Sequence, residues 1–206
     1  YGTADATILY IIAWHEAWKW LGDEALFSQY EQVVKKCLRW IDEYGDRDGD
    51  GFQEYQTRSD QGYENMAWKD AGDAVLYPDG SLVKGPKALC ELQGYVFDAK
   101  RRAAEAADHF GDPGLAAALR REAADLQQRF EERFWCEDLG YYAYALDGEK
   151  KPVKTIASNA GHLLWSGIVR QDRAERVVRR MREPDMWSGW GIRTLSERHP
   201  AYNPFS

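Results

Sequence analysis

The sequence predicts an all-α protein built from helical hairpins, with long connecting loops and one small β-hairpin. Two observations support this prediction. Apolar residues recur at helical spacing over long stretches of the 206 residues. Gly-Asp pairs interrupt these stretches at points where one helix would end and the next begin.

The first predicted hairpin begins at the N-terminal end of the sequence. From Ala4 to Leu21 the residues are apolar on almost every side, which is typical of a helix enclosed by protein. Gly22 fits the left-handed position after a helix, and Asp23 fits the N-cap of the next one. That next helix is amphipathic, with apolar residues at Phe27, Tyr30, Val34, Cys37, Leu38 and Ile41. The sequence therefore predicts an inner helix followed by an outer one.

The Gly-Asp turn occurs once more, and a third pair of helices follows it. At residues 110–113 Gly111 ends a helix and Asp112 caps the next, which has Pro at its first position and an apolar stripe from Leu115 to Phe134. A third pair of helices is predicted from Ala160 to Arg182, around Asp172. Repeated helical hairpins of this size predict a helical array or toroid.

Two long polar segments separate the hairpins. They cover residues 46–69 and 135–153, and the second contains alternating Tyr and Ala residues before an Asp147-Gly148 turn, which predicts a β-hairpin. Loops of this length are usually functional, so we expect the chemistry to lie on them.

Composition excludes several classes of protein. With 44% hydrophobic and 30% charged residues the chain has the balance of one globular body, and its net charge of −7 leaves no cationic face for nucleic acid. No apolar run approaches the roughly 18 residues of a membrane span, so no membrane partner is expected. The three cysteines form no CxxC pair, which favours a reducing, cytoplasmic location. No zinc, nucleophile-elbow or phosphate-loop motif is present.

Tryptophan and tyrosine are abundant, with nine Trp and twelve Tyr. Flat aromatic rings stack on the apolar faces of sugars, so carbohydrate is the first ligand class to consider. Four tryptophans at helical spacing are interpreted as core residues, namely Trp14, Trp18, Trp20 and Trp40. Three others lie in loop-like sequence, namely Trp68, Trp187 and Trp190.

Two carboxylates follow the first of these loop tryptophans. A helix starting near Asp70 would present Asp70 and Asp73 on one face, where one of them could protonate a leaving oxygen in glycoside hydrolysis. The alternative is purely structural, with Asp70 as an N-cap and Asp73 favouring the helix dipole. The spacing alone does not decide between these interpretations.

Residues 46–51 have the DxDxDG start of a calcium-binding loop. The candidate ligands are Asp46, Asp48, Asp50, Phe52 and Glu54. Position twelve of such a loop falls on Thr57, so the usual bidentate glutamate is missing and Glu54 would have to replace it. A solvated Asp/Gly turn explains the same residues.

Taken in order, seven motifs resemble the catalytic domain of bacterial amylo-α-1,6-glucosidases, the glycogen-debranching family within the six-hairpin (α/α)6-toroid glycosidases. The motifs are residues 4–7 (ADAT), 45–55 (GDRDGDGFQEY), 68–70 (WKD), 92–96 (LQGYV), 158–165 (SNAGHLLW), 188–195 (SGWGIRTL) and 202–204 (YNP). The resemblance implies that residues 1–206 form a single segment of such a domain, a partial (α/α)6 toroid truncated at both ends.

The resemblance also implies roles for individual residues. It assigns the general acid to Asp70. Together with Asp73, the candidate substrate-binding residues are then Asp5, Trp68, Lys69, Asn159, His162, Trp190, Arg193 and Asn203. No cofactor is required by this interpretation, and a structural calcium ion in the Asp-rich loop is the one candidate.

The function that follows is the inverting release of terminal glucose from α-1,6 branch points of glycogen-like or malto-oligosaccharides. Family members continue beyond the Tyr-Asn-Pro motif into the segment that carries the catalytic base, so the base is expected beyond residue 206 and this segment alone is expected to be inactive. Three alternatives stay open: a trehalase-like or other oligosaccharide glucosidase, a carbohydrate-binding segment without turnover, and a helical-repeat interaction module.

Overall fold

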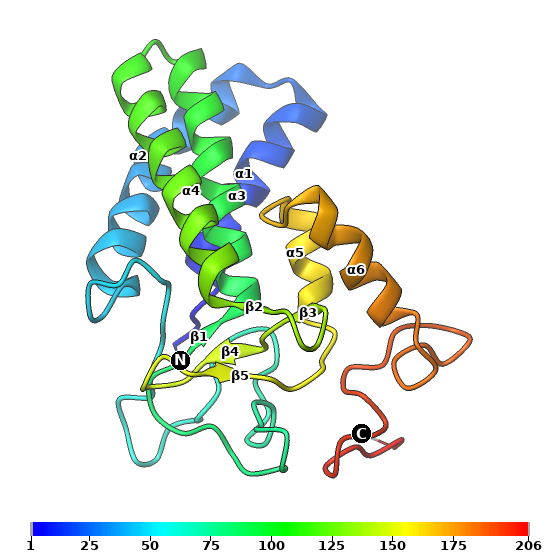
Figure 1. The fold of residues 1–206 in the computed structure, drawn as a ribbon. Coiled ribbons are helices and arrows are strands. Elements are labelled where there is room, and N and C mark those ends of the chain that lie inside the picture. The colour runs from blue at the N-terminus through cyan, green and yellow to red at the C-terminus, as the bar shows by residue number, and fades with distance from the viewer. Residues whose placement is uncertain (1, 206) are drawn as a thin grey trace.

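A computed structural model describes residues 2–205 of the protein. The described residues form six α-helices in three successive hairpins, with the loops and short strands gathered at one end of the helices (Figure 1). The helices are α1 (Ala6–Leu21), α2 (Glu24–Trp40), α3 (Cys90–His109), α4 (Pro113–Arg133), α5 (Ala160–Ser166) and α6 (Gln171–Met181). A single π-helical turn, η1 (Ile41–Gly45), extends α2.

The predicted helix turns are confirmed in the first two hairpins. Gly22 adopts the left-handed conformation with a φ angle of 63°, and the Asp23 carboxylate accepts a hydrogen bond from the backbone N–H of Leu26 at 2.9 Å. Asp112 caps α4 in the same way, accepting from the N–H of Leu115 at 3.0 Å. Local capping interactions therefore determine where the two helices of each hairpin end and begin.

The third hairpin is shorter than predicted and turns earlier. Gly167, with a φ angle of 75°, ends α5, and Asp172 lies in the first turn of α6 instead of at the corner. Helix α6 has no side-chain cap, and the N–H of its N-cap residue Arg170 donates to a Glu131 carboxylate oxygen on α4 at 2.9 Å.

The helices form two rows. Helix α3 packs against α1 and α5 as well as against its hairpin partner α4, and its residues from Cys90 to Lys100 are all buried. The odd-numbered helices thus form an inner row, and each even-numbered helix covers its own partner. This is a partial (α/α)6 toroid, as predicted. One core assignment is wrong: Trp20 lies in the last turn of α1 with 85% of its surface exposed, whereas Trp18 in the same turn faces α2 and stacks on Phe27.

Short strands connect the loops to the helical rows. The three-stranded antiparallel sheet has the order β1 (Ala88–Leu89), β4 (Ala145–Leu146), β5 (Pro152–Val153), and β2 (Trp135–Cys136) pairs with β3 (Tyr141–Tyr142). Leu89 pairs with Ala145, and Ala145 pairs with Val153. The predicted β-hairpin around Asp147 is therefore β4–β5. Because β1 leads directly into α3, the sheet fixes the first turn of the most buried helix.

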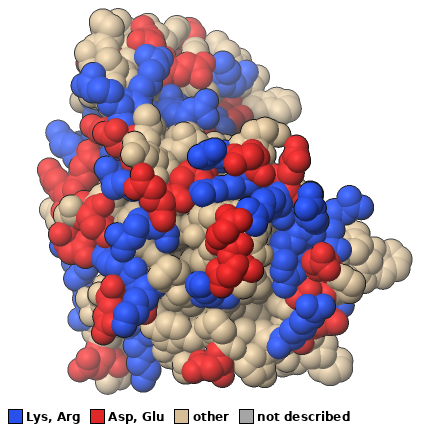
Figure 2. Space-filling view, viewed as in Figure 1, with Lys and Arg blue, Asp and Glu red and all other residues tan. Residues whose placement is uncertain are grey.

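The surface carries both signs of charge. On the face seen in Figure 2, lysine and arginine side chains alternate with aspartate and glutamate. The face in this view is therefore not uniformly cationic. Among the described residues no helix combines the length and the apolar character needed to cross a membrane.

Candidate active site

The loop that carries Trp68, Asp70 and Asp73 does not form the predicted helix. The side-chain amide of Asn65 donates to the carbonyl of Ala71 at 2.7 Å, and that same carbonyl also accepts from the N–H of Ala74. Because a helix starting near Asp70 needs this carbonyl for its own ladder, the backbone makes one tight turn and then extends. Asp70 and Asp73 are both exposed on this turn, so their predicted placement on one helix face is wrong.

This loop is tied to the ends of the helices and to the β4–β5 hairpin. The carbonyl of Met66 accepts from the N–H of Ala4 at 2.7 Å, which brings the predicted site residue Asp5 close to the loop. On the other side the Tyr144 hydroxyl donates to the carbonyl of Ala74 at 3.0 Å. The loop is therefore held at one end by a backbone hydrogen bond and at the other by a side-chain hydroxyl, although it has no regular secondary structure.

Trp68 presents an open aromatic surface. Its side chain is 59% exposed, and its ring lies 5.2 Å from the ring of His162 on α5. His162 is held in turn by the Tyr95 hydroxyl, 2.6 Å from its Nδ1 atom. Burial and the nearby Lys69 ammonium lower the pKa of His162, which favours the neutral imidazole. The structure therefore supports Trp68 from behind and leaves its outer face free.

Lys69 points in the opposite direction from Asp70, into the protein. Its ammonium donates to the carbonyl of Thr194 at 2.6 Å and lies 5.4 Å from the centre of the Tyr144 ring. Burial lowers the pKa of Lys69 to about 8, although the nearby Glu91 carboxylate acts in the opposite direction. Lys69 thus joins this loop to the 188–195 segment, and it retains a positive charge below about pH 8.

Glu91 is the residue that sequence reasoning missed. It lies in the first turn of α3 with no exposed surface, and burial raises its pKa to about 7 against the opposing influence of its backbone N–H and of Lys69. The buried Asn159 amide lies beside the Glu91 carboxylate and also lowers its pKa, but burial outweighs this effect. The sequence offers one indication of this residue, because Glu91 lies inside the apolar run from Ala88 to Leu92, where burial of a carboxylate is costly.

The remaining predicted binding residues lie on the C-terminal loops. Trp190 is 97% exposed at the tip of a turn. Arg193 donates to the carbonyl of Pro184 at 3.0 Å and pairs with Glu197 at 3.0 Å, so its guanidinium holds its own loop together. The side chain of Asn203 accepts from the N–H of Phe205 at 3.0 Å. These three residues are therefore less closely connected to Trp68 than Lys69 and His162 are.

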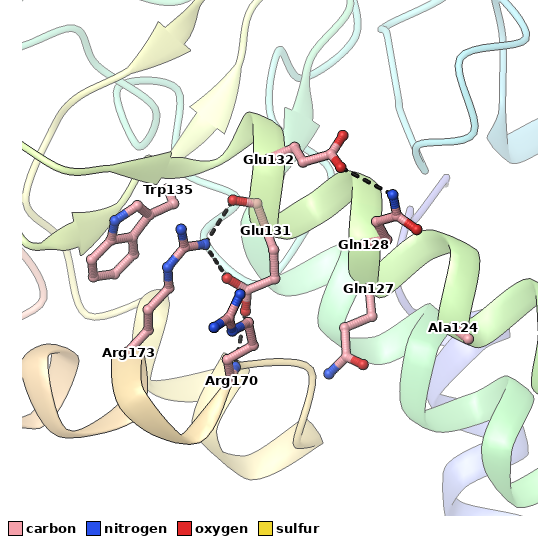
Figure 3. Close-up of a pocket in the computed structure, with 8 residues that line it drawn as sticks. All are labelled: Ala124, Gln127, Gln128, Glu131, Glu132, Trp135, Arg170 and Arg173. Atoms are coloured by element: carbon pink, nitrogen blue, oxygen red, sulfur yellow. Dashed lines mark hydrogen bonds and ion pairs between the residues drawn. The ribbon is translucent and has the colours of Figure 1, made fainter.

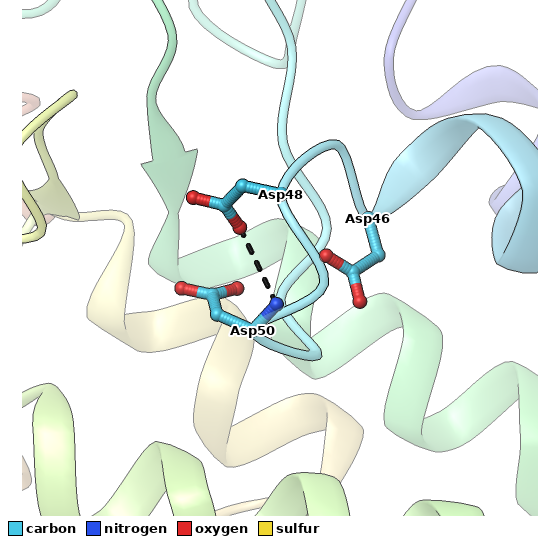
Figure 4. A group of neighbouring side chains, drawn as sticks. All are labelled: Asp46, Asp48 and Asp50. Carbon is cyan, nitrogen blue, oxygen red and sulfur yellow. Dashed lines mark hydrogen bonds between the residues drawn. The ribbon is translucent and has the colours of Figure 1, made fainter.

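The candidate metal ligands form a separate group. Asp46, Asp48 and Asp50 lie on one turn with oxygen atoms within 4.8 Å of one another (Figure 4). The ammonium of Lys150 also lies at this turn, 2.8 Å from Asp50 and 3.0 Å from Asp48. A cationic side chain therefore already contacts the oxygens that a metal ion would use.

A cleft of about 410 Å³ between α4 and α6 contains none of the predicted site residues. The Arg173 guanidinium pairs with Glu131 there and lies 4.6 Å from the centre of the Trp135 ring (Figure 3). Because its main charged groups are already paired, we interpret this cleft as a joint between two hairpins.

Comparison with known proteins decides the family. The model of the mannosylglycerate hydrolase MGH1-like glycoside hydrolase domain matches residues 5–206. The chain belongs to this glycoside hydrolase family. The loops described above therefore belong to an MGH1-like glycoside hydrolase domain. Among curated proteins none matches the chain in sequence.

Solved structures share the fold of this MGH1-like domain. A rhamnosidase from Klebsiella oxytoca with rhamnose bound aligns with a TM-score of 0.60 at 15% identity, over 87% of this chain and 30% of its own. A GH78 family rhamnosidase of Bacillus sp. GL1 aligns with a TM-score of 0.65 at 17% identity, over 88% of this chain and 17% of its own. The neutral trehalase of Saccharomyces cerevisiae aligns with a TM-score of 0.52 at 17% identity, over 63% of this chain and 25% of its own. The chain thus spans less than a third of the length of these three proteins, and the likeness extends to fold alone.

Proposed function

We propose that this MGH1-like domain removes terminal glucose from α-1,6 branch points of glycogen-like or malto-oligosaccharides with inversion at the anomeric carbon. Asp70 acts as the general acid that protonates the glycosidic oxygen. The opposing base is a carboxylate supplied from outside residues 1–206, at the roughly 6.5 to 9.5 Å that leaves room for the attacking water.

The observation that carries this proposal is the contrast between two carboxyl groups. Glu91 has a pKa raised to about 7 but no exposed surface, so a glycosidic oxygen cannot reach it. Asp70 is exposed, lies two residues after the open ring of Trp68, and is fixed by the turn that Asn65 holds. Access to substrate therefore favours Asp70 as the acid.

Trp68 supports the sugar in this proposal. An exposed ring held from behind by His162 offers a flat surface for the apolar face of a glucose ring. A sugar stacked there would exclude water from Asp70, which strengthens a proton-donating interaction in the transition state. Asp5, Lys69, Asp73, Asn159, His162, Trp190, Arg193 and Asn203 remain proposed binding residues of the same pocket.

The first test is a substrate panel with a matched pair of variants, made in the complete gene product that contains this chain. The panel consists of an α-1,6-branched limit dextrin, trehalose and mannosylglycerate. We expect turnover of the dextrin, and Asp70→Asn should reduce it roughly 10²–10⁴-fold, because the proton donor is lost. Asp60→Asn changes an exposed acid on a neighbouring turn and should leave turnover unchanged.

Two results would contradict the proposal. Turnover of the Asp70→Asn variant at the wild-type rate would remove Asp70 from the mechanism. Hydrolysis of trehalose or mannosylglycerate without any action on the dextrin would show that the protein is a glycosidase with a different substrate from the one proposed.

A further inference from the structure

The Asp-rich turn at residues 46–54 is ordered mainly by its own backbone. The two carboxylate oxygens of Asp46 accept from the N–H groups of Gly49 at 2.8 Å and Gly51 at 2.9 Å, and Asp50 accepts from the N–H of Phe52 at 3.0 Å. These bonds turn the chain so that the carboxylates of Asp46, Asp48 and Asp50 converge (Figure 4). Converging carboxylates repel one another unless a cation lies among them.

Lys150 supplies that cation from a distant part of the sequence. Its ammonium lies 2.8 Å from an oxygen of Asp50 and 3.0 Å from an oxygen of Asp48, and it also contacts the carboxylate of Glu54. The side chains of Lys150 and Glu54 are only 16% and 2% exposed. The ammonium donates a hydrogen bond to Glu54 and forms ion pairs with Asp48 and Asp50, so one lysine neutralises charge on all three carboxylates.

The backbone of Lys150 is adapted to this position. Among the described residues it is the one non-glycine residue with a positive φ angle, 60°. The β4–β5 turn holds it there, since the Lys150 N–H donates to the carbonyl of Asp147 at 2.9 Å and the next N–H donates to the Asp147 carboxylate at 2.9 Å. An L-residue adopts this conformation only at a cost, which its surroundings must offset.

A second cation lies on the other side of the turn. The guanidinium of Arg129 on α4 packs so closely on Gly51 that a Cβ atom there would approach it to 2.6 Å. A calcium ion placed among Asp48, Asp50 and Glu54 would therefore meet the ammonium directly and a guanidinium nearby. The residues present do not fit calcium, because the Lys150 ammonium already pairs with Asp48, Asp50 and Glu54, and both Asp46 oxygens accept from backbone N–H groups.

We propose that Lys150 takes the place of a metal ion in this turn. Its ammonium joins residues 46–54 to the β4–β5 hairpin, so the domain is stable without calcium. Removal of the ammonium leaves a set of oxygen donors suited to a hard divalent cation, so the Lys150→Gln variant should bind calcium.

The test compares wild type with Lys150→Gln and with Lys151→Gln in the complete gene product. Lys151 is adjacent, 72% exposed and paired with the equally exposed Glu149, so it controls for loss of a lysine from the same turn. Thermal unfolding is followed in EDTA and in calcium chloride, and calcium binding is measured by titration calorimetry. Lys150→Arg, which keeps a cation, serves as a conservative variant.

We expect the unfolding midpoints of wild type, Lys151→Gln and Lys150→Arg to be the same in EDTA and in calcium. Lys150→Gln should unfold about 10 °C lower in EDTA, because buried carboxylates lose their partner, and calcium should restore most of this difference. Calorimetry should detect a site with a dissociation constant of roughly 0.1 mM in Lys150→Gln alone.

Three results would overturn the proposal. Destabilisation of wild type by EDTA would show that a metal ion already serves this turn. A Lys150→Gln variant that folds but ignores calcium in both assays would show that the donor set cannot hold a cation. A Lys150→Gln variant that stays unfolded in calcium as well as in EDTA would show that a metal cannot replace the ammonium.

Discussion

Glu91 and Lys69 illustrate how a buried ionisable group connects stability to pH in this domain. Glu91 is buried near the loop that carries Asp70, and Lys69 lies half-buried on that loop. Burial raises the pKa of Glu91 and lowers that of Lys69, and both shifts favour the neutral form. The pKa of Glu91 rises from 4.5 to about 7, so between these two values the folded protein binds more protons than the unfolded chain. Stability should therefore fall as the pH rises through this window.

The first prediction at this scale concerns Glu91→Gln. The neutral amide keeps the shape and removes the charge, so the variant should match wild type near pH 4.5 and exceed its stability at pH 8 by about 3 kcal/mol at most. Urea unfolding at the two pH values measures the difference. Glu43→Gln, at an exposed position, should show no such divergence. A Glu91→Gln variant less stable than wild type at pH 8 would show that the ionised carboxylate is required.

Lys69 shows why neighbouring residues in a motif need not share a role. Trp68 and Asp70 are exposed, whereas the half-buried Lys69 between them donates to the carbonyl of Thr194 and lies beside the ring of the buried Tyr144. One motif therefore provides both exposed side chains and a contact to a neighbouring segment. Our account gives Asp70 the chemical role and Lys69 the task of holding the loop.

At the scale of elements, the turn at Ala71 within the loop of residues 65–76 is held by one side-chain amide. Asn65 is buried, and its amide holds the carbonyl of Ala71 at 2.7 Å while its oxygen accepts from the hydroxyl of Tyr55 at 3.3 Å. Among the described residues, no other side chain donates a hydrogen bond to the carbonyls of Ala71 and Gly72 in the turn that displays Asp70. Asn65 therefore positions the proposed general acid without touching substrate.

A second prediction follows for Asn65→Ala. Loss of this amide leaves buried polar groups without a partner, which should cost about 1–3 kcal/mol of stability and reduce turnover through a misplaced Asp70. Hydrogen exchange should rise in residues 66–77 and stay unchanged in α4. Gln61→Ala, on the exposed side of the same region, is the matched control. Unchanged exchange in this loop would contradict the role given to Asn65.

The elements that the sequence predicts well are those with local signals. Asp23 and Asp112 cap helices three residues ahead, so the hairpins can be located from the sequence alone. Strand β1 has two residues, and its partner Ala145 lies more than fifty positions away, so its pattern is too short to detect. The helix expected from Asp70 fails for a similar reason, because the group that prevents it is the side chain of Asn65, which no helical pattern includes.

At the scale of the whole molecule, the β4–β5 hairpin connects parts that are distant in sequence. Tyr144 binds the loop of Asp70 at 3.0 Å, Thr155 binds the carbonyl of Leu76 at 2.7 Å, and Lys150 binds the Asp-rich turn. The inner helices α1, α3 and α5 present their ends to this hairpin, where the loops gather (Figure 1). The candidate site is therefore assembled on loops that a sheet and a helical row hold in place.

The parts of the site that sequence could not predict depend on this long-range assembly. The spacing of Asp46, Asp48 and Asp50 predicts converging oxygens, and they do converge. The identity of the cation beside them depends on Lys150, which lies a hundred positions later in the chain. Glu91 was missed because its burial follows from packing among α3 and its neighbours, which periodicity does not describe.

We propose that this domain belongs to an inverting exo-acting α-1,6-glucosidase. The most direct test is proton NMR of a limit dextrin with single α-1,6 glucose stubs, incubated with the complete gene product. The account predicts that β-glucose appears first and the α anomer follows by mutarotation, and that the Asp70→Asn variant releases neither. Early α-glucose would contradict inversion, and a folded wild-type enzyme that releases no glucose would contradict the debranching activity itself.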